Sequence, residues 1–305
     1  MNKKTEIGSG ILIWVLLLAG ILSGCKGGKK PAGEETQITV PTENAAVIED
    51  FKKAKTIFNA LPSPLESAML VKSSGSKFDV ALLNPIGNDN KYVTNKSMAL
   101  NLGIYTCDLS FTSLYEKTQL IIDYMNSAKK MADGLGILKV IDQPTIDRLE
   151  ENINNSEIVM EIISDTYMNS NSYLEENGQS AISTMVLTGG WFEGLYISTQ
   201  LIDFKNFNDN KLVGKIIDQK LSIDILLNLL ESNKGNPSID EIILQVQKLK
   251  VIFDKVTITS SQIKPEYDKA SNSTMLKSDV KTNMTPEVFR ELTAAVAEIR
   301  SSFVK

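Results

Sequence analysis

The stretch TGGWFEGLY, residues 188–196, lies in the middle of the most apolar segment of the chain, Gln179 to Phe204. Gly190 and Gly194 are four residues apart, so in a helix they share one face and let a neighbouring helix approach closely. Glycine costs about 0.5–1 kcal/mol against alanine in a helix, so two glycines require a packing or ligand reason. Glu193, Gln200 and several Ser and Thr residues argue against a membrane span. We therefore expect a central core helix.

Outward from this segment, apolar residues recur at helical spacing between capping and stop signals. Ser63-Pro64-Leu65-Glu66 has the pattern of a capping box with proline at the first helical position. Gly178 is a natural stop for the long helix before the central one. The predicted helices cover residues 43–61, 64–73, 78–83, 96–110, 113–133, 142–152, 156–177, 179–204, 211–232, 237–255 and 286–303.

These segments predict an all-α fold, a single domain over residues 43–305 with about nine to eleven helices and short connections. The exception is the segment near 257–280. Thr257 to Ser261 alternates polar and apolar residues, Pro265 interrupts it, and Ser, Thr, Asn and Lys dominate afterwards. We expect a long loop or a small peripheral hairpin there.

The composition excludes several classes of function. The chain has no histidine, which removes Ser-His-Asp and Cys-His catalysis and the usual zinc sites. The net charge of −5 argues against a nucleic-acid surface. The sequence has no Gly-rich phosphate loop and no acidic calcium loop, so we expect no cofactor and no metal. Cys107 lies in an apolar run without a basic neighbour, which favours a buried, inert thiol.

The first residues carry an export signal. Lys3 and Lys4 precede an apolar run of about a dozen residues, too short for a stable bilayer span of about 20. Leu22-Ser23-Gly24-Cys25 resembles the bacterial lipobox. The resemblance implies that residues 1–24 are a lipoprotein signal peptide and that Cys25 becomes the lipidated N-terminus. The alternatives are an ordinary cleaved signal or an uncleaved anchor with a chance cysteine.

Residues 25–42 comprise the lipidated cysteine and a flexible linker rich in Gly, Lys, Pro and Glu. Lipoproteins that stay in the inner membrane carry an aspartate after the cysteine, so Lys26 favours the outer membrane. Surface-exported lipoproteins of the Bacteroidetes type carry acidic residues at this point, whereas residues 26–30 are basic. We therefore expect a chain held on the outer membrane by its N-terminal lipid and facing the periplasm.

Two acidic residues beside aromatic ones are the candidate functional residues. Glu193 lies beside the close-packed glycine face and next to Trp191, and Asp108 lies near Tyr105. If their helices pack together, two carboxylates face one cavity, where a pair can act as acid and base, as in glycoside hydrolysis. The alternative is that each carboxylate accepts hydrogen bonds from helix ends or from Tyr and Lys side chains, and only fixes packing.

Three segments resemble recurring parts of a family of uncharacterised outer-membrane lipoproteins from Bacteroidetes-type bacteria: residues 61–64 (LPSP), 99–105 (ALNLGIY) and 187–196 with Thr199-Gln200. The resemblance extends through most of the mature chain. It implies the same location and a single domain, and it implies no activity.

The sequence thus predicts a lipid-anchored periplasmic helical protein that works by binding. The partner is an envelope protein, or a small ligand held between helices around Tyr105, Asp108, Trp191 and Glu193. The alternative is a histidine-free hydrolase that acts on cell-envelope glycan through Asp108 and Glu193. A structural spacer is a third class. An open cleft with the carboxyl groups about 5–9.5 Å apart would favour the enzyme, and a sealed pair would leave binding or scaffolding.

Overall fold

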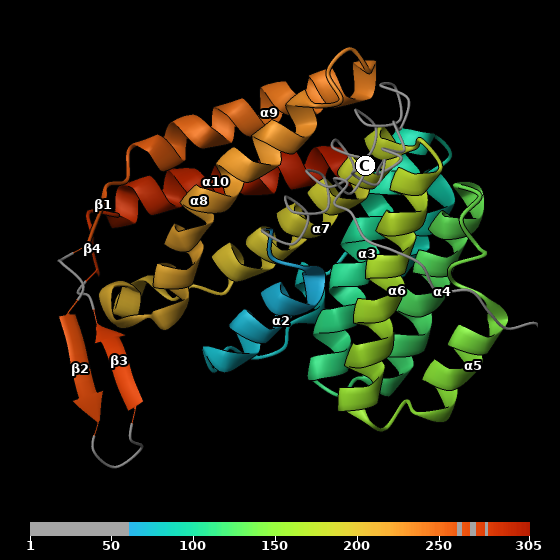
Figure 1. Cartoon of the computed structure of the whole chain (residues 1–305), viewed down its shortest axis with the longest axis horizontal. Helices are drawn as coiled ribbons and strands as arrows, with labels where there is room; N and C mark the ends of the chain where they lie inside the picture. Colours follow the sequence, from blue (N-terminus) through green and yellow to red (C-terminus); the bar gives the residue numbers. More distant parts are fainter. Residues whose placement is uncertain (1–60, 261–263, 269–272, 278–279) are drawn as a thin grey trace, which may run out of the picture. The chain divides into compact units, whose positions relative to one another are not determined.

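Helices α3 (Asn95–Leu114) and α7 (Ser180–Gln200) pack against each other along their lengths and are buried at nearly every position (Figure 1). The computed structural model describes residues 61–260, 264–268, 273–277 and 280–305, all within one compact unit, Thr42–Lys305. The signal peptide, the linker and all but the last residue of the predicted helix 43–61 lie outside the described residues.

The other elements pack around this central pair or extend from it. The helices are α2 (Pro64–Ser73), α4 (Thr118–Gly134), α5 (Gln143–Glu151), α6 (Ser156–Glu176), α8 (Lys211–Glu231), α9 (Pro237–Asp254) and α10 (Pro286–Phe303), with short 3₁₀ turns at Val80–Leu82, Ile86–Lys91 and Phe204–Asp209. Helices α2, α4 and α6 contact α3, whereas α2, α8 and α10 contact α7. The predicted all-α class is therefore confirmed.

Glycines make the close approach of the central helices possible. A Cβ added to Gly103 on α3 would overlap the carbonyl oxygen of Val186 and lie 2.6 Å from the backbone nitrogen of Gly190, both on α7. The face shared by Gly190 and Gly194 meets α2, since a Cβ on Gly194 would lie 2.5 Å from Cβ of Ser67. The glycines of residues 188–196 thus have a packing reason, as the sequence suggested.

Many hydroxyl groups in the central helices donate to a carbonyl of their own helix. Thr106 donates to the carbonyl of Leu102 at 2.7 Å, and Thr188 donates to the carbonyl of Thr184 at 2.7 Å. Bonds to the preceding turn hide the polar atom and leave a surface that packs like an apolar one. This accounts for the many Ser and Thr residues in helices that water does not reach.

Caps begin most helices where the sequence places them. Ser63 accepts from the backbone N–H of Glu66 at 3.2 Å while the Glu66 carboxylate accepts from Ser63, which is the predicted capping box. Gly178 has a φ of 70°, the left-handed conformation expected of a helix stop. No helix in the described part of the chain is long and apolar enough to cross a membrane.

Three predicted helix boundaries are wrong. The helix predicted over 78–83 is only a 3₁₀ turn. Helix α3 continues past residue 110 because Thr112 donates to the carbonyl of Leu109 instead of capping a new helix, and the chain turns at Glu116, whose φ is 56°. The central helix stops at Gln200, and Asp203 caps the separate turn that follows.

The segment after α9 forms strands, which favours the hairpin over the loop. Strand β1 (Ile258–Ser260) pairs antiparallel with β4 (Val280–Thr282), and β2 (Lys264–Asp268) pairs antiparallel with β3 (Ser273–Lys277). The chain thus runs outward from α9 through β1 and β2 and returns antiparallel to them through β3 and β4 to the start of α10 (Figure 1).

Candidate functional site

Glu193, from the middle of α7, forms a buried ion pair with Arg300 near the end of α10. The guanidinium donates from Nε to Oε2 at 2.8 Å and from Nη2 to Oε1 at 2.7 Å. The Glu193 side chain is fully buried and that of Arg300 is 10% exposed. The guanidinium also lies over the ring of Tyr196, 4.7 Å from its centroid. This two-pronged geometry satisfies both carboxylate oxygens and ties α10 to the central pair.

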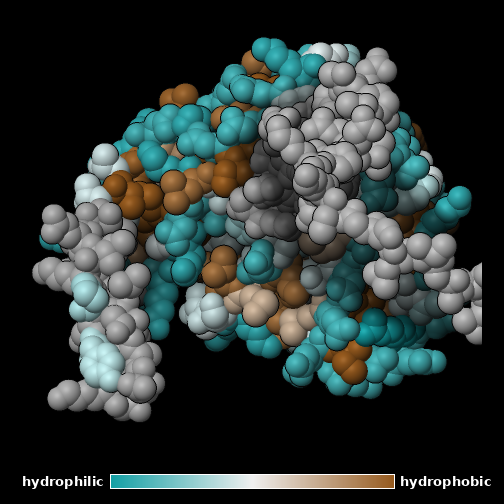
Figure 2. All heavy atoms as spheres, in the orientation of Figure 1, coloured by the Kyte–Doolittle hydropathy of each residue, from teal (hydrophilic) through white to brown (hydrophobic). Residues whose placement is uncertain are grey.

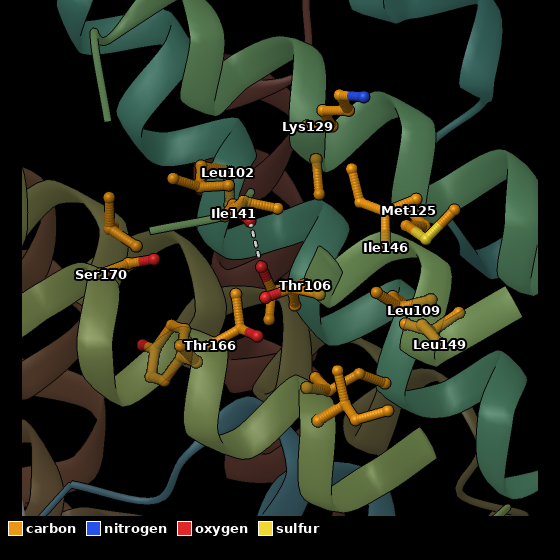
Figure 3. Close-up of a pocket in the computed structure, with 16 residues that line it drawn as sticks. Leu102, Thr106, Leu109, Met125, Lys129, Ile141, Ile146, Leu149, Thr166 and Ser170 are labelled. Carbon is orange, nitrogen blue, oxygen red and sulfur yellow. Dashed lines mark hydrogen bonds between the residues drawn. The ribbon is translucent and has the colours of Figure 1, made fainter. Parts of the chain in front are cut away.

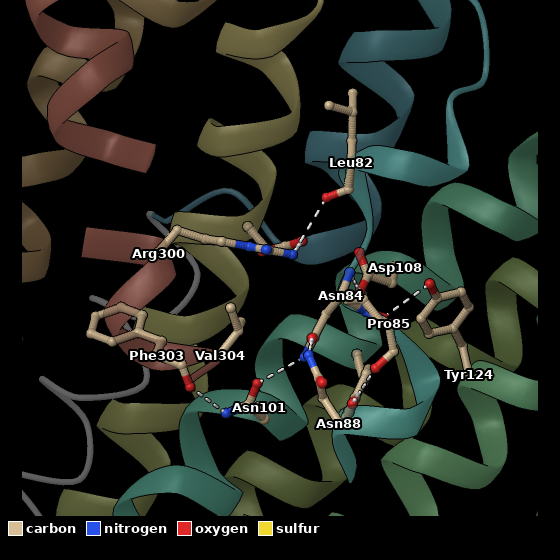
Figure 4. Close-up of polar contacts among 12 residues, drawn as sticks. Leu82, Asn84, Pro85, Asn88, Asn101, Asp108, Tyr124, Arg300, Phe303 and Val304 are labelled. Atoms are coloured by element: carbon tan, nitrogen blue, oxygen red, sulfur yellow. Dashed lines mark hydrogen bonds and ion pairs between the residues drawn. The ribbon is translucent and has the colours of Figure 1, made fainter. Parts of the chain in front are cut away.

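Asp108, from α3, is the third charged residue in this cluster and is also fully buried. Its Oδ2 accepts from the backbone N–H of Asn84 at 3.1 Å, while no donor reaches Oδ1. Figure 4 shows Asp108 beside Asn84, and the Arg300 guanidinium contacts the carbonyl of Leu82 at 3.4 Å. The charges of Glu193 and Arg300 both act on Asp108. The two carboxyl groups proposed from the sequence therefore do lie together.

The environment of Asp108 favours its protonated form. Burial raises its pKa well above the usual range, and the negative charge of Glu193 raises it further; Arg300 and the Asn84 N–H act in the opposite direction. A protonated Oδ1 becomes a donor and can give its hydrogen to the Glu193 carboxylate. The cluster then holds one negative and one positive charge, so it is neutral and its polar atoms are satisfied.

Tyr105 forms part of the wall of this cluster. Its ring lies between those of Tyr92 and Tyr124, with centroids 6.1 and 6.0 Å away, and its hydroxyl donates to the carbonyl of Pro85 at 3.3 Å. Tyr124 donates to the carbonyl of Asn84 at 3.1 Å. Burial raises the pKa of Tyr105 above its usual value, so it stays protonated. These contacts hold the 84–91 loop over the acidic cluster (Figure 4).

Trp191, the fourth residue named from the sequence, does not join the other three. Its indole Nε1 donates to Oε1 of Gln219 on α8 at 3.1 Å, and its ring packs edge-on against Phe192, with centroids 5.1 Å apart. It lines a small cavity of about 20 Å³ between α2, α7 and α8. Trp191 therefore packs between helices and its hydrogen bond to Gln219 links α7 to α8.

The acidic cluster has the geometry of a structural pair. Asp108 and Glu193 are each fully buried, and neither lines the two cavities described for this chain. A glycosidase needs its two carboxyl groups on either side of a bond in an open cleft. Cys107, next to Asp108, is buried as expected, and burial raises the pKa of its thiol. The cluster offers a glycan no route to either acid.

Arg300 is the residue that sequence reasoning missed. It lies between Ile299 and Phe303 on the buried face of α10, which also includes Phe289 and Val296. A charged residue at such a position indicates a buried partner, because an unpaired buried charge is costly. The sequence therefore indicates that Arg300 has a buried partner. It does not indicate which residue this is, because Glu193 lies 107 positions away.

A second region has free space instead of a charge pair. A cavity of about 50 Å³ lies between α3, α4, α5 and α6, and Val186 of α7 also lines it. Figure 3 shows the side chains around it. Its lining is mostly aliphatic: Leu102, Leu109, Met125, Ala128, Ile141, Ile146, Leu149, Ile162, Ile163 and Val186, with Lys129, Thr106, Thr145, Thr166, Tyr167 and Ser170 as the remaining residues. Most of these side chains are buried, whereas Lys129, Ile141, Thr145 and Thr166 are half-buried and form the rim.

Ser170 is a buried polar residue in the lining of this cavity. It is 4% exposed, and its hydroxyl has no hydrogen-bond partner among the residues that the structure describes. A buried hydroxyl left unpaired costs about 1–3 kcal/mol, so such groups are rare without a reason. An unpaired hydroxyl beside open space is the signature expected of a group that a ligand or water completes.

Helix α5 is the least firmly held wall of the cavity. It has nine residues, of which only Ile146 and Leu149 are buried, and both face the cavity. A short helix held by two apolar side chains opens at a small free-energy cost compared with global unfolding. The wall that separates the cavity from solvent is therefore also the wall that moves most readily.

No group of three or more acidic or cysteine side chains within the described ranges could hold a metal ion. Comparison of the chain with protein-family models, with curated proteins and with solved structures finds no match. The family resemblance seen in the sequence stays a prediction.

Proposed function

We propose that this chain is a lipid-anchored periplasmic protein that binds a small ligand in the cavity between α3, α4, α5 and α6. The observation that supports this most directly is the unpaired Ser170 hydroxyl beside unfilled, mostly aliphatic space. Ligand sites are typically apolar hollows with a few placed polar groups, as this one is. The acidic cluster around Glu193, by contrast, has its ion pair formed internally and lines neither of the two cavities.

The site proposed differs from the one named from the sequence. Ligand contact by Tyr105, Asp108, Trp191 and Glu193 stays an untested prediction. The hydrolase alternative depends on access to Asp108 and Glu193, and both are fully buried. Their geometry favours a structural role, so we do not extend the hydrolase proposal.

The binding proposal is tested by filling the cavity. The full-length chain in phospholipid nanodiscs is screened against small aliphatic probes by ligand-observed NMR, with empty nanodiscs as the blank. Ser170→Val places two methyl groups in the cavity, and it should abolish probe signals seen with the wild type. Ser164→Val is the matched control, because Ser164 is on the same helix, is half-buried and does not line the cavity. Equal signals from both variants would refute the site.

The lipid anchor is proposed from the sequence alone, since residues 1–60 lie outside the described residues. Cys25 follows the lipobox-like Leu22-Ser23-Gly24, and Lys26 favours the outer membrane. Cells fed an alkyne-labelled fatty acid should incorporate the label into the wild type and not into Cys25→Ser. Fractionation should then place the labelled chain in the outer membrane, protected from protease added to intact cells.

A protein partner is the second candidate function. Leu244 and Val251 are seven residues apart on α9, so they share a face, and they are 61% and 62% exposed. Figure 2 shows hydrophobic side chains standing among hydrophilic ones over α9. In-cell cross-linking from position 244 tests this candidate: one discrete adduct supports it, and no adduct, or a smear, counts against it.

A further inference from the structure

The charge nearest the cavity lies on its rim and faces outward. Among the described residues that line the cavity, Lys129 is the one charged residue. Figure 3 shows its nitrogen pointing away from the cavity, and Nζ donates to Oε1 of Gln143 at 3.4 Å. An ionised ligand group inside would therefore lose its hydration without gaining an opposite charge, which is costly. The lining favours an uncharged ligand.

The buried hydroxyl groups of the lining differ in how they are bonded. Thr106 donates to the carbonyl of Leu102 at 2.7 Å, and Thr145 donates to Oδ1 of Asp142 at 2.7 Å. Ser170 is buried and has no such bond within the described part of the chain. A water molecule in a cavity needs two to four polar partners, whereas a ligand with one oxygen needs only Ser170. The lining therefore suits a molecule that is aliphatic except for one oxygen.

The volume limits the size of that molecule. About 50 Å³ holds roughly four non-hydrogen atoms, at about 10–15 Å³ for each water-sized sphere. That is the size of three carbons and one oxygen, and it is too small for a ring or a sugar. A ligand of four such atoms binds no tighter than roughly 40 µM. We therefore expect weak binding, measurable with millimolar probes.

We propose that the ligand is a free, uncharged aliphatic molecule of about three carbons and one oxygen, such as a short alcohol or ketone, whose oxygen bonds to the Ser170 hydroxyl. This inference rests on the proposed function and names the class of ligand. The carbons of the ligand supply the contacts that the aliphatic side chains around the cavity lack. Its oxygen accepts from Ser170, the buried donor that has no partner in the described residues.

The charge of the ligand is tested with three probes of four non-hydrogen atoms each: propan-1-ol, acetate and propylammonium. Methyl groups of the lining, such as those of Ile146, Leu149 and Ile163, report binding by NMR in the full-length chain in nanodiscs at neutral pH. Probe concentrations are measured in the aqueous phase. Propan-1-ol should shift these methyl signals in the millimolar range. Acetate and propylammonium should bind at least about tenfold more weakly, because neither charge finds a partner in the cavity.

The hydrogen bond is tested with two serine variants. Ser170→Ala should weaken propan-1-ol binding about three- to tenfold, the loss expected for one neutral hydrogen bond. It should leave binding of xenon unchanged, because xenon makes no hydrogen bond. Ser127→Ala is the matched control, since Ser127 is another buried, unpaired hydroxyl and does not line the cavity. Equal losses of propan-1-ol binding in the two variants would overturn the assignment to Ser170.

The size limit is tested with a longer alcohol. Hexan-1-ol has seven non-hydrogen atoms and should bind more weakly than propan-1-ol, because the cavity is full after about four and a longer chain must force the side chains apart. Tighter binding of hexan-1-ol would overturn the size limit and show that the cavity takes the end of a longer chain.

The outcomes separate this inference from the function on which it rests. If acetate or propylammonium binds as tightly as propan-1-ol, or if xenon binds and propan-1-ol does not, the cavity is a binding site and the assigned class of ligand is wrong. If neither xenon nor any other probe shifts the lining methyl signals, both fail and the space is a packing defect. Propan-1-ol binding that exceeds that of both ions and weakens in Ser170→Ala alone supports both.

Discussion

The acidic cluster and the cavity lie on the same central helix, α3, and treat buried polar groups in opposite ways. At the cluster, Glu193 and Arg300 make two charged hydrogen bonds. Burial raises the pKa of Asp108, which favours its neutral form, so Asp108 adds no further charge. At the cavity, Ser170 has no partner and the side chains around it leave space. A cluster that is complete stabilises the fold, whereas a site that is incomplete is available to a ligand.

The largest effect is expected at the ion pair. Glu193→Gln leaves the Arg300 guanidinium buried beside a neutral amide and should lower the free energy of unfolding by about 3–5 kcal/mol. Urea unfolding followed by circular dichroism measures it. Glu241→Gln, which breaks the exposed pair with Lys96, should cost less than about 1 kcal/mol. A small loss in Glu193→Gln would mean that the cluster is not structural.

The close approach of α3 and α7 gives the next largest effect. Gly103→Ala forces a methyl group into the backbone of α7 and should lower the free energy of unfolding by at least about 1–3 kcal/mol. Gly214→Ala on α8 has nothing within 4 Å of the added carbon and should raise it by about 0.5–1 kcal/mol. In thermal unfolding, the melting temperature should fall in Gly103→Ala and rise in Gly214→Ala.

A smaller effect with the opposite sign is expected in the cavity. Ser170→Ala removes an unpaired buried hydroxyl and should raise the free energy of unfolding by about 1 kcal/mol without ligand. Ser127→Ala on α4 removes another unpaired buried hydroxyl, one that does not line the cavity, and should stabilise to a similar extent. Only Ser170→Ala should weaken binding of the aliphatic probes in the cavity. A loss of stability in Ser170→Ala would show that its hydroxyl has a partner after all.

The effect expected at Asp108 depends on pH. Burial and the charge of Glu193 raise the pKa of Asp108, so the folded chain holds this proton where the unfolded chain has released it. Wild-type stability therefore falls as the pH rises from the usual aspartate pKa of about 3.9 toward the raised value. Asp108→Asn does not titrate, so its stability relative to wild type should rise over the same range. A relative fall would mean that Asp108 is ionised when folded.

Local signals in the sequence predicted the fold better than they predicted the site. The Ser63–Glu66 capping box and the Gly178 stop were read correctly because each depends on residues within one turn. The boundary predicted between residues 110 and 113 was wrong because the Thr112 hydroxyl has two bonding options, a new cap or the preceding turn, and it takes the second.

The site depends on contacts that no local pattern carries. Burial of Glu193 could be predicted from the glycine face beside it, but its pairing with Arg300 needs the position of α10 relative to α7. The cavity is less predictable still, since it is the space left after side chains from α3, α4, α5, α6 and α7 have packed. Leucine and isoleucine at helical spacing look the same in sequence whether they fill a core or line a hollow.

Hydrogen exchange of the full-length chain, with and without a saturating small aliphatic probe that binds the wild type, tests the central claim most directly because it reports on both regions at once. The account predicts slower exchange in α5 and in residues 162–170 of α6, where a ligand would hold the movable wall closed. It predicts no change in the 84–91 loop that covers the acidic cluster. Slower exchange confined to that loop and the end of α10 would contradict the account and return the site to Asp108 and Glu193.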